Sequence, residues 1–317
     1  MAAPTRRIGV EIEYSNLSLD ESAKLIQRLF GGTVRKESRY VFHVDGTEWG
    51  DFHLEVDAVL LKKIVENGML ESIAQFFKEY GDVAEFVDET AAMIVPFEIA
   101  APPVPLEAIE SMDRLTAALR QSGAWGTTLK LRYAFGLHLN IEPPDLDIGT
   151  VLRIFRAFLM LQDWLEQQIG IDMTRKISPF IDAFPKSYVK RIMAPDYRPD
   201  WHTFILDYLE ENPTRNRALD LLPLMAHIDE NLVKSRLPKE KISPRPAFHY
   251  RLPNSKVDQL NWSISDEWRL WQVVEELATD KPASKNLRRD YIAHLNDLFS
   301  TKETWIEKSH RCVIDLA

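Results

Sequence analysis

Two glutamates near the N-terminus have the spacing of paired metal ligands. The segment Gly9-Val-Glu11-Ile-Glu13 alternates between apolar and acidic side chains, and this period of two predicts a strand with both carboxylates on one face. Side chains two residues apart on a strand lie about 6 to 7 Å apart, so both can reach one hard cation or a neighbouring pair. A strand edge that faces solvent and carries acids explains the same pattern equally well.

A third acid and a histidine occur in two other predicted strands. Glu98 is a lone acid among apolar residues, where burial without a charge partner would be costly. His138, Asn140 and Glu142 share the polar face of another alternating segment, and a histidine there suits a metal or a phosphate. The alternatives are a solvent-facing acid and a hydrogen-bonded structural histidine.

Basic residues in two later segments are candidates for binding an anion. His249 and Arg251 are two residues apart in a predicted strand and therefore share a face, where arginine can hold a carboxylate or phosphate through two hydrogen bonds. Arg215 and Arg217 in NPTRNR can reach a phosphate or a substrate carboxylate. Surface ion pairs and helix capping are the alternatives for these arginines.

The elements that position these residues are a mixture of strands and helices. Ser18 and Glu21 form a predicted capping box for a helix that Gly31-Gly32 ends, and Asn212-Pro213 predicts the start of another. Strands are predicted over residues 8–14, 40–44, 52–60, 93–99, 129–141 and 248–252. Helices are predicted over residues 105–121, 148–169, 219–232, 266–277 and 287–298.

Composition excludes several classes of protein. A net charge of -9 over 317 residues argues against a general nucleic-acid binder. The sequence has no apolar run of the roughly 18 to 20 residues that span a bilayer and no apolar signal-peptide core, so we expect a cytoplasmic protein without a membrane partner. Without repeats or flexible linkers, residues 1–317 are predicted to form a single catalytic domain with a mainly helical insertion around 146–240.

The motifs also occur together and in an order that resembles a known family. The segments GVEIEY, Asp45-Gly-Thr47, FEIAAPP and FGLHLNIE, followed by a late strand with an arginine, look like the putative amidoligase enzymes, which are relatives of glutamine synthetase and glutamate–cysteine ligase. The resemblance spans most of the chain. It is strengthened by the segments GDFHLEVD, NPTRNRALDLLPL, RPAFHYRLPN and SDEWRLWQVVEELA.

The resemblance implies a fold and a set of metal ligands. The expected fold is α+β, with an antiparallel sheet of the glutamine-synthetase-like type curved around the active site and flanked by helices. The implied metal ligands are Glu11, Glu13, Glu98, His138 and His249.

Two positions depart from the family pattern. Asn140 stands where the family often has a second histidine, and His249 replaces the glutamate of a Glu-x-Arg motif. Because imidazole suits manganese better than magnesium, we expect His249 to broaden the metal preference. The resemblance also predicts that His249 and Arg251 face the same cavity as Glu11 and Glu13.

The implied activity is ATP- and Mg²⁺-dependent ligation of a small-molecule or peptide carboxylate to an amine through an acyl phosphate. Arg251 would stabilise the transferring phosphoryl group, Asp45 would orient the amine or a metal-bound water, and Arg215 and Arg217 would contact the nucleotide. A non-catalytic nucleotide- or amino-acid-binding relative and a metal-dependent hydrolase are the alternatives. The identity of both substrates and the oligomeric state are open.

Overall fold

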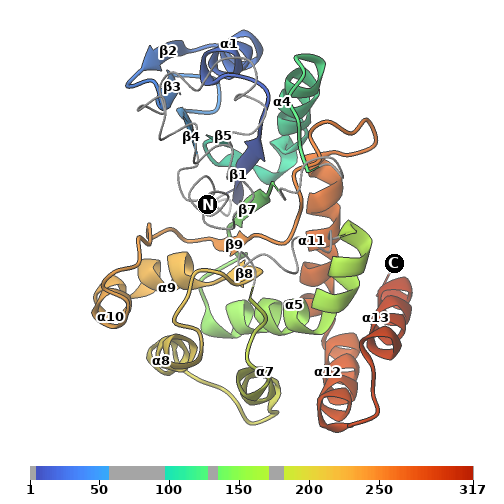
Figure 1. Ribbon diagram of the computed structural model, residues 1–317. Helices are drawn as coiled ribbons and strands as arrows, with labels where there is room; N and C mark the ends of the chain where they lie inside the picture. The colour runs from blue at the N-terminus through green and yellow to red at the C-terminus, as the bar shows by residue number, and fades with distance from the viewer. Residues whose placement is uncertain (1–4, 57–96, 128–134, 171–181, 317) are drawn as a thin grey trace, which may run out of the picture. The chain divides into compact units, whose positions relative to one another are not determined.

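An antiparallel sheet forms the centre of the first of two structural units, which comprises Met1–Asn140 and Pro253–Ser265 (Figure 1). The structure, a computed structural model, describes residues 5–56, 97–127, 135–170 and 182–316. In this unit the strand order is β2-β3-β4-β5-β1-β7, and β6 pairs with β1. The strands are β1 (Arg7–Tyr14), β2 (Thr33–Lys36), β3 (Val41–Asp45), β4 (Phe52–Val56), β5 (Phe97–Ala100), β6 (Val104–Pro105) and β7 (Leu137–Ile141).

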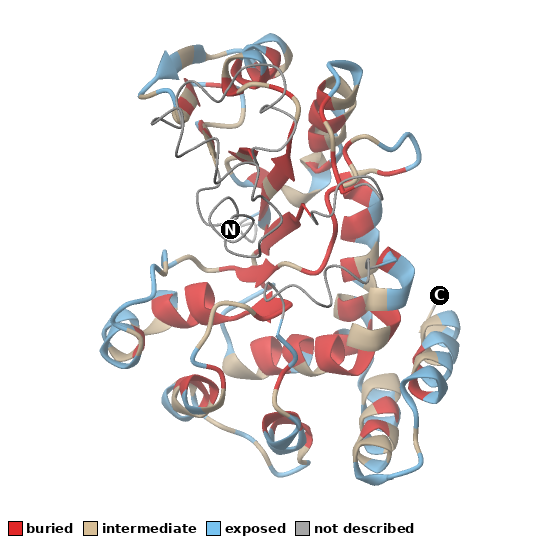
Figure 2. Cartoon of the chain, in the orientation of Figure 1, coloured by how far each residue is buried: buried red, intermediate tan, exposed pale blue. Residues whose placement is uncertain are grey.

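Strand alternation gives this sheet one apolar and one polar face. The apolar face carries the apolar residues of β1, which are fully or almost fully buried (Figure 2): Ile8, Val10, Ile12 and Tyr14. Their cross-strand partners continue the layer. One apolar row across four strands consists of Ile12, Ile99, Leu54 and Phe42. The adjacent polar rows carry Glu13, Glu98 and Glu55, and Glu11, His53, His43 and Arg35. The alternation predicted for β1 is therefore confirmed and extends through the sheet.

Helix α1 (Leu19–Phe30) packs against the apolar face. The predicted capping box is present, because the Ser18 side chain accepts from the Glu21 N–H while the Glu21 carboxylate accepts from the Ser18 N–H. The helix ends at Gly31, whose φ of 76° favours glycine. Phe30 stacks on Phe52 of β4 at 5.6 Å between ring centroids. These contacts fix the helix over the side of the sheet opposite the acids.

Helix α4 (Glu110–Gln121) packs against α1 and follows a 3-10 turn, η1 (Leu106–Ala108). Asp113 of α4 accepts hydrogen bonds from the backbone N–H groups of Ile264 and Ser265. The late segment Pro253–Ser265 is thereby tied to the first unit.

The second unit, Ile141–Leu252 with Asp266–Ala317, is mainly helical. Its central helix, α5 (Ile148–Ile169), has the predicted bounds, begins at the Asp147 cap and ends at Gly170. The Trp305 indole donates to the Met160 carbonyl at 2.9 Å and joins α13 to α5. The other elements are α7 (Lys186–Met193), α8 (Trp201–Glu211), β8 (Leu219–Asp220), α9 (Leu222–Ile228), α10 (Glu230–Arg236), β9 (Phe248–Tyr250), α11 (Ile264–Thr279), α12 (Lys281–Asn296) and α13 (Lys302–Leu316).

The segment after Asn212-Pro213 differs from the prediction of one helix over 219–232. Asn212 is the C-cap of α8, and Leu219–Asp220 forms β8, which pairs antiparallel with β9. The following helix starts only after this strand, with Pro223 in its first turn. Pairing with a strand nearly thirty residues later overrides the local helical pattern. A short stretch of sequence does not include this partner strand, so the pattern alone did not indicate β8.

The predicted class of mixed helices and antiparallel sheet is confirmed, whereas the glutamine-synthetase-like fold and the single-domain organisation stay predictions. The predicted strands over 52–60, 93–99 and 129–141 are described only in part, as β4, β5 and β7, and the rest lies outside the described residues. Helix α13 had no predicted counterpart. Among the described helices, none is long and apolar enough to cross a membrane.

Candidate metal centre

Three strands of the first unit bring the predicted acids and one histidine to the same face. Glu13 of β1 lies directly opposite Glu98 of β5. On the other side of β1, the Glu13 N–H donates to the Gly136 carbonyl at 3.0 Å, and the Asn140 side chain reaches Glu11. Because Glu13 contacts Gly136 and Glu11 contacts Asn140, β1 and β7 run antiparallel. His138 lies between these two contacts along β7, beside Glu11 and Glu13.

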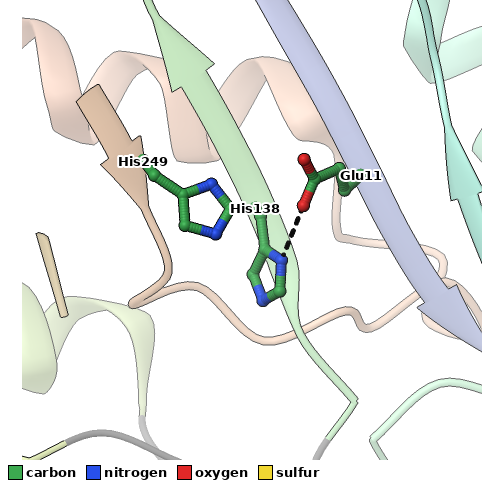
Figure 3. Close-up of side chains that lie close together, drawn as sticks. All are labelled: Glu11, His138 and His249. Atoms are coloured by element: carbon green, nitrogen blue, oxygen red, sulfur yellow. Dashed lines mark hydrogen bonds and ion pairs between the residues drawn. The ribbon is translucent and has the colours of Figure 1, made fainter. Parts of the chain in front are cut away.

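The distances define a compact cluster of Glu11, Glu13, Glu98 and His138, called the acid cluster below. His138 Nδ1 lies 3.0 Å from Glu11 Oε2 (Figure 3), and His138 Nε2 lies 3.7 Å from Glu13 Oε1. Ligand atoms of Glu13, Glu98 and His138 all lie within 4.8 Å of one another. The side chains of Glu13 and His138 are only 10% and 7% exposed, so this is not an ordinary wet strand edge.

The hydrogen bond to Glu11 sets the tautomer of a neutral His138 ring. An ionised carboxylate only accepts hydrogen bonds, so Nδ1 of His138 donates and a neutral ring keeps a lone pair on Nε2. That nitrogen is the one nearer Glu13. A carboxylate that orients a metal-binding imidazole in this way is a recurrent feature of metal sites. Glu11 thus has an orienting contact, and its predicted role as a direct ligand stays a prediction.

Two residues that the sequence did not assign a role hold the carboxylates in place. Asn140 Nδ2 donates to Glu11 Oε1 at 2.8 Å, and the Gly136 N–H donates to Glu13 Oε2 at 2.6 Å. Gly9 makes room for the amide, because a Cβ at Gly9 would lie 3.3 Å from Asn140 Cβ. The only sequence signal for Asn140 was its place on the polar face beside His138.

The donor set of the acid cluster fits a divalent cation. Carboxylates crowded on one face repel one another, and a cation offsets that repulsion. Two carboxylates and an imidazole nitrogen suit Mg²⁺ or Mn²⁺, whose remaining positions are filled by water or phosphate oxygens. Glu13, Glu98 and His138 are the residues that would hold such an ion.

Asp45 lies at the end of β3, on the polar side of the same sheet. Arg35 Nε donates to Asp45 Oδ2 at 2.7 Å, and this hydrogen bond holds the pKa of the Asp45 carboxyl below its ordinary value. The carboxylate is therefore ionised at neutral pH and already engaged with a cation. Its predicted contact with an amine or a metal-bound water stays a prediction.

His249 belongs to the second unit, where an arginine determines its protonation. Arg245 Nη2 lies 3.0 Å from His249 Nδ1. Arginine can only donate, so Nδ1 accepts and a neutral ring carries its hydrogen on Nε2. In this tautomer the ring donates a hydrogen bond through Nε2. The predicted metal contact of His249 through Nε2 would require the hydrogen to move to Nδ1 and the contact with Arg245 to break, and it stays a prediction.

The predicted phosphate-binding arginines also lie in the second unit. Arg251 Nη1 donates to the Arg215 carbonyl at 3.0 Å, and Arg215 Nε lies 3.9 Å from Asp220 Oδ2. Asp220 is fully buried, which raises the pKa of its carboxyl to about 6 although Arg251, Arg215 and Arg245 oppose the shift. Arg215, Arg245 and Arg251 around Asp220 are called the arginine cluster below.

Arg217 makes its own contacts within the second unit. Its guanidinium donates to the Ala183 carbonyl and lies 5.4 Å from the centre of the Phe184 ring. Arg217 is also only 6% exposed. These contacts are structural, although they are not the surface ion pair or helix cap given as the alternative. The predicted contact of Arg217 with the nucleotide stays a prediction, as does the shared cavity of His249, Arg251, Glu11 and Glu13.

A comparison of the whole sequence with known families decides where this chain belongs. The family model described as "Putative amidoligase enzyme" matches residues 4–273 of the 317-residue chain. The chain belongs to this family. No curated protein and no solved structure matches it.

The amidoligase match includes every strand and every site residue named above. It begins before β1 and ends within α11, so α12 and α13 lie beyond it. The resemblance noted from the motifs is therefore confirmed. The acid cluster and the arginine cluster are both features of the matched part of this amidoligase.

Proposed function

We propose that this amidoligase uses ATP and Mg²⁺ to join a carboxylate to an amine through an acyl phosphate. The observation that carries the proposal is the acid cluster, in which Glu13, Glu98 and His138 bring ligand atoms within 4.8 Å of one another. Membership of the amidoligase family supports the class of reaction. A ligase that consumes ATP needs a compartment that supplies it, which agrees with the expected cytoplasmic location.

The proposed reaction has two steps. A substrate carboxylate oxygen attacks the γ-phosphorus of ATP, the bond to the ADP oxygen breaks, and an acyl phosphate forms. A neutral amine then attacks the acyl carbon, inorganic phosphate leaves, and the nitrogen loses a proton to give the amide. Both steps develop negative charge on phosphate oxygens, which positive groups must stabilise.

The side chains divide this work by charge. Glu13, Glu98 and His138 hold Mg²⁺, with Glu11 as a ligand or as the group that orients His138. Magnesium supplies charge neutralisation at the phosphate oxygens. Arg251, with Arg215 and Arg217, is proposed to contact phosphate, since a guanidinium matches its geometry.

His249 and Asp45 are proposed to have two different roles. His249 is proposed to act at the phosphates in one of two ways. It donates a hydrogen bond to them from Nε2, as its bond to Arg245 favours, or it is a ligand of Mn²⁺. Asp45, ionised beside Arg35, is proposed to orient the amine or a water.

A trapping assay tests the reaction without knowledge of the amine. Hydroxylamine replaces the amine and converts an acyl phosphate into a hydroxamate, so only carboxylates need to be screened. We expect ATP-dependent hydroxamate formation and phosphate release from at least one amino acid or short peptide, in the presence of Mg²⁺. A chelator should abolish both signals, and Glu13→Gln should remove most of them.

The rival functions give different results in the same assay. A non-catalytic relative binds ATP without releasing phosphate above background. A metal-dependent hydrolase consumes an amide or ester substrate without nucleotide. Either result, in a correctly folded protein, would contradict the proposed ligase.

A further inference from the structure

A pair of histidines lies on the polar face of the first unit, away from the acid cluster. His43 of β3 and His53 of β4 are directly paired across the two strands. Ala100 of β5 separates His53 from Glu11 in the same cross-strand row. With about 4.8 Å between neighbouring strands, the nearer histidine starts about 10 Å from Glu11. The histidine pair is therefore a separate location, well beyond the roughly 4 Å spacing of a dinuclear metal centre.

The outer nitrogen of each ring faces a carboxylate. His43 Nε2 lies 2.9 Å from Glu37 Oε2, and His53 Nε2 lies 3.2 Å from Glu55 Oε2. Because ionised carboxylates only accept, both Nε2 atoms donate and each neutral ring carries a bare lone pair on Nδ1. The hydrogen bond from His43 also lowers the pKa of the Glu37 carboxyl, which keeps it ionised.

The two inner nitrogens face each other. The Nδ1 atoms of His43 and His53 are 3.5 Å apart, and the ring centroids are 4.9 Å apart at an interplanar angle of 53°. Two nitrogen lone pairs this close repel unless a positive species lies beside both. A hydrogen on either Nδ1 would instead leave the Nε2 of that ring as an acceptor opposite an acceptor carboxylate.

The spacing of the nitrogens matches a transition ion. Two metal–nitrogen bonds of about 2.0 to 2.1 Å to atoms 3.5 Å apart enclose an angle of about 113 to 122°, close to the roughly 110° of a tetrahedral ion. The side chains of His43 and His53 are 17% and 39% exposed. Water can therefore reach the remaining coordination positions, and an ion can enter from solvent.

The surrounding charge favours a cation. Arg35 is the neighbouring base, and its guanidinium is engaged by Asp45 at 2.7 Å and lies 3.6 Å from Glu37. Counted over the described residues, the carboxylates of Glu37, Asp45 and Glu55 lie beside the pair together with one arginine. The summed charge of these described neighbours is negative.

We infer that His43 and His53 form a binding site for a divalent transition ion of the zinc type, held through both Nδ1 atoms and completed by water. Glu37 and Glu55 orient the rings through their Nε2 hydrogens, as carboxylates do beside metal-bound imidazoles. Imidazole nitrogen selects Zn²⁺, Co²⁺ or Cu²⁺ over Mg²⁺, so the site differs in metal preference from the acid cluster. The bound ion cross-links β3 to β4 on the polar face.

Zinc titration calorimetry of the full chain in excess Mg²⁺ tests this site. We expect a Zn²⁺-binding event that disappears in His43→Gln and in His53→Gln but persists in His138→Gln, in addition to any zinc held by the acid cluster. The exposed His202 provides the matched control, and His202→Gln should leave the event unchanged. Glu37→Gln should weaken it by about 10- to 100-fold, since orienting partners have effects of this size.

Two outcomes would overturn the inference. One is an unchanged zinc isotherm in both His43→Gln and His53→Gln, which would assign the zinc to other groups. The other is no zinc binding by the wild type, which would leave a shared proton between the rings. Thermal unfolding of each variant without metal checks that the fold is retained. The Mg²⁺- and ATP-dependent reaction is not part of this readout, so failure of the proposed ligase activity does not affect the result.

Discussion

The acid cluster of the first unit and the arginine cluster of the second unit are built with opposite charges. In the first, carboxylates of β1 and β5 surround one imidazole at the polar face of a sheet. In the second, three arginines surround one buried carboxylate, Asp220, at the short β8–β9 pair. The first arrangement suits a cation and the second suits phosphate or carboxylate oxygens. An ATP-dependent ligase requires both kinds of site.

Two histidines, His138 in the acid cluster and His249 beside Arg245 of the arginine cluster, show how neighbouring side chains affect function. His138 faces a carboxylate through Nδ1 and keeps a lone pair on Nε2, whereas His249 faces an arginine through Nδ1 and keeps a hydrogen on Nε2. The same side chain is thus prepared as a ligand in one place and as a donor in the other. The comparison predicts different responses to mutation and to metal.

The largest effect is expected from the acid cluster. Glu13→Gln keeps the side-chain volume but removes a charged ligand, so turnover with Mg²⁺ should fall at least about 100-fold. Glu11→Gln should also remove most activity, because it loses either a ligand or the group that orients His138. Steady-state assays of the hydroxamate reaction measure both, and the exposed Glu48 provides the control Glu48→Gln. Normal activity and metal dependence in both variants would contradict the assignment.

Binding of nucleotide should depend on the metal. ATP with Mg²⁺ should stabilise the folded protein by about 2.7 kcal/mol at a hundredfold excess over the dissociation constant, seen as a rise of several degrees in melting temperature. ATP with a chelator should give a much smaller rise. Equal shifts would mean that nucleotide binding does not involve the acid cluster.

In the arginine cluster, Asp220 should make stability depend on pH. Its folded-state pKa of about 6 lies above the ordinary value of 3.8, so the folded protein binds the extra proton. The stabilisation from this proton is fully present below about pH 4 and is lost as pH rises through 6. The free energy of unfolding changes by roughly 2 to 3 kcal/mol over this range. Asp220→Asn retains an oxygen for the Leu222 N–H and should lack this component.

Denaturant unfolding at pH 4, 5, 6 and 7 measures that difference. The stability of Asp220→Asn relative to wild type should increase over this range and level off above pH 6. A constant difference would show that the arginines hold the Asp220 pKa near its ordinary value.

The sequence was informative where a local pattern determines the structure. Alternation in β1 and β7 placed Glu11, Glu13 and His138 on polar strand faces, and the Ser18 capping box located α1. It also identified the family, since several such motifs occur in a fixed order. These properties depend on residues that are neighbours along the chain.

Properties that depend on partners far along the chain were not predictable. Asn140 looked like a departure from the family, yet its amide holds Glu11 from 129 positions away. The segment 219–220 looked helical, but β9 makes it a strand. The bond from Arg245 to His249 spans only four positions, but the direction of two side chains does not follow from alternation alone.

The smallest effect is expected at Arg245 and tests the role of His249. Arg245→Met retains an apolar stem but removes the donor that engages Nδ1 of His249. The ring can then carry its hydrogen on Nδ1 and offer Nε2 to a metal. If His249 reaches the bound cation, as predicted from the sequence, the preference for Mn²⁺ over Mg²⁺ should rise by up to about tenfold, or 1.4 kcal/mol.

Activation constants for the two ions in four proteins separate the roles of His249: wild type, Arg245→Met, His249→Gln and the double variant. In the wild type, His249→Gln should change the Mn²⁺ preference little, because Nε2 already carries a hydrogen. In the Arg245→Met background, the same substitution should abolish the gain in Mn²⁺ preference.

His249→Glu should shift the preference toward Mg²⁺ by supplying an oxygen ligand, and Arg251→Ala should lower turnover with either ion. Loss of Mn²⁺ activation on His249→Gln in the wild type, with no gain in Arg245→Met, would mean that His249 already binds metal and that its bond to Arg245 does not set its protonation. That result would make the two histidines alike and remove the contrast between the clusters.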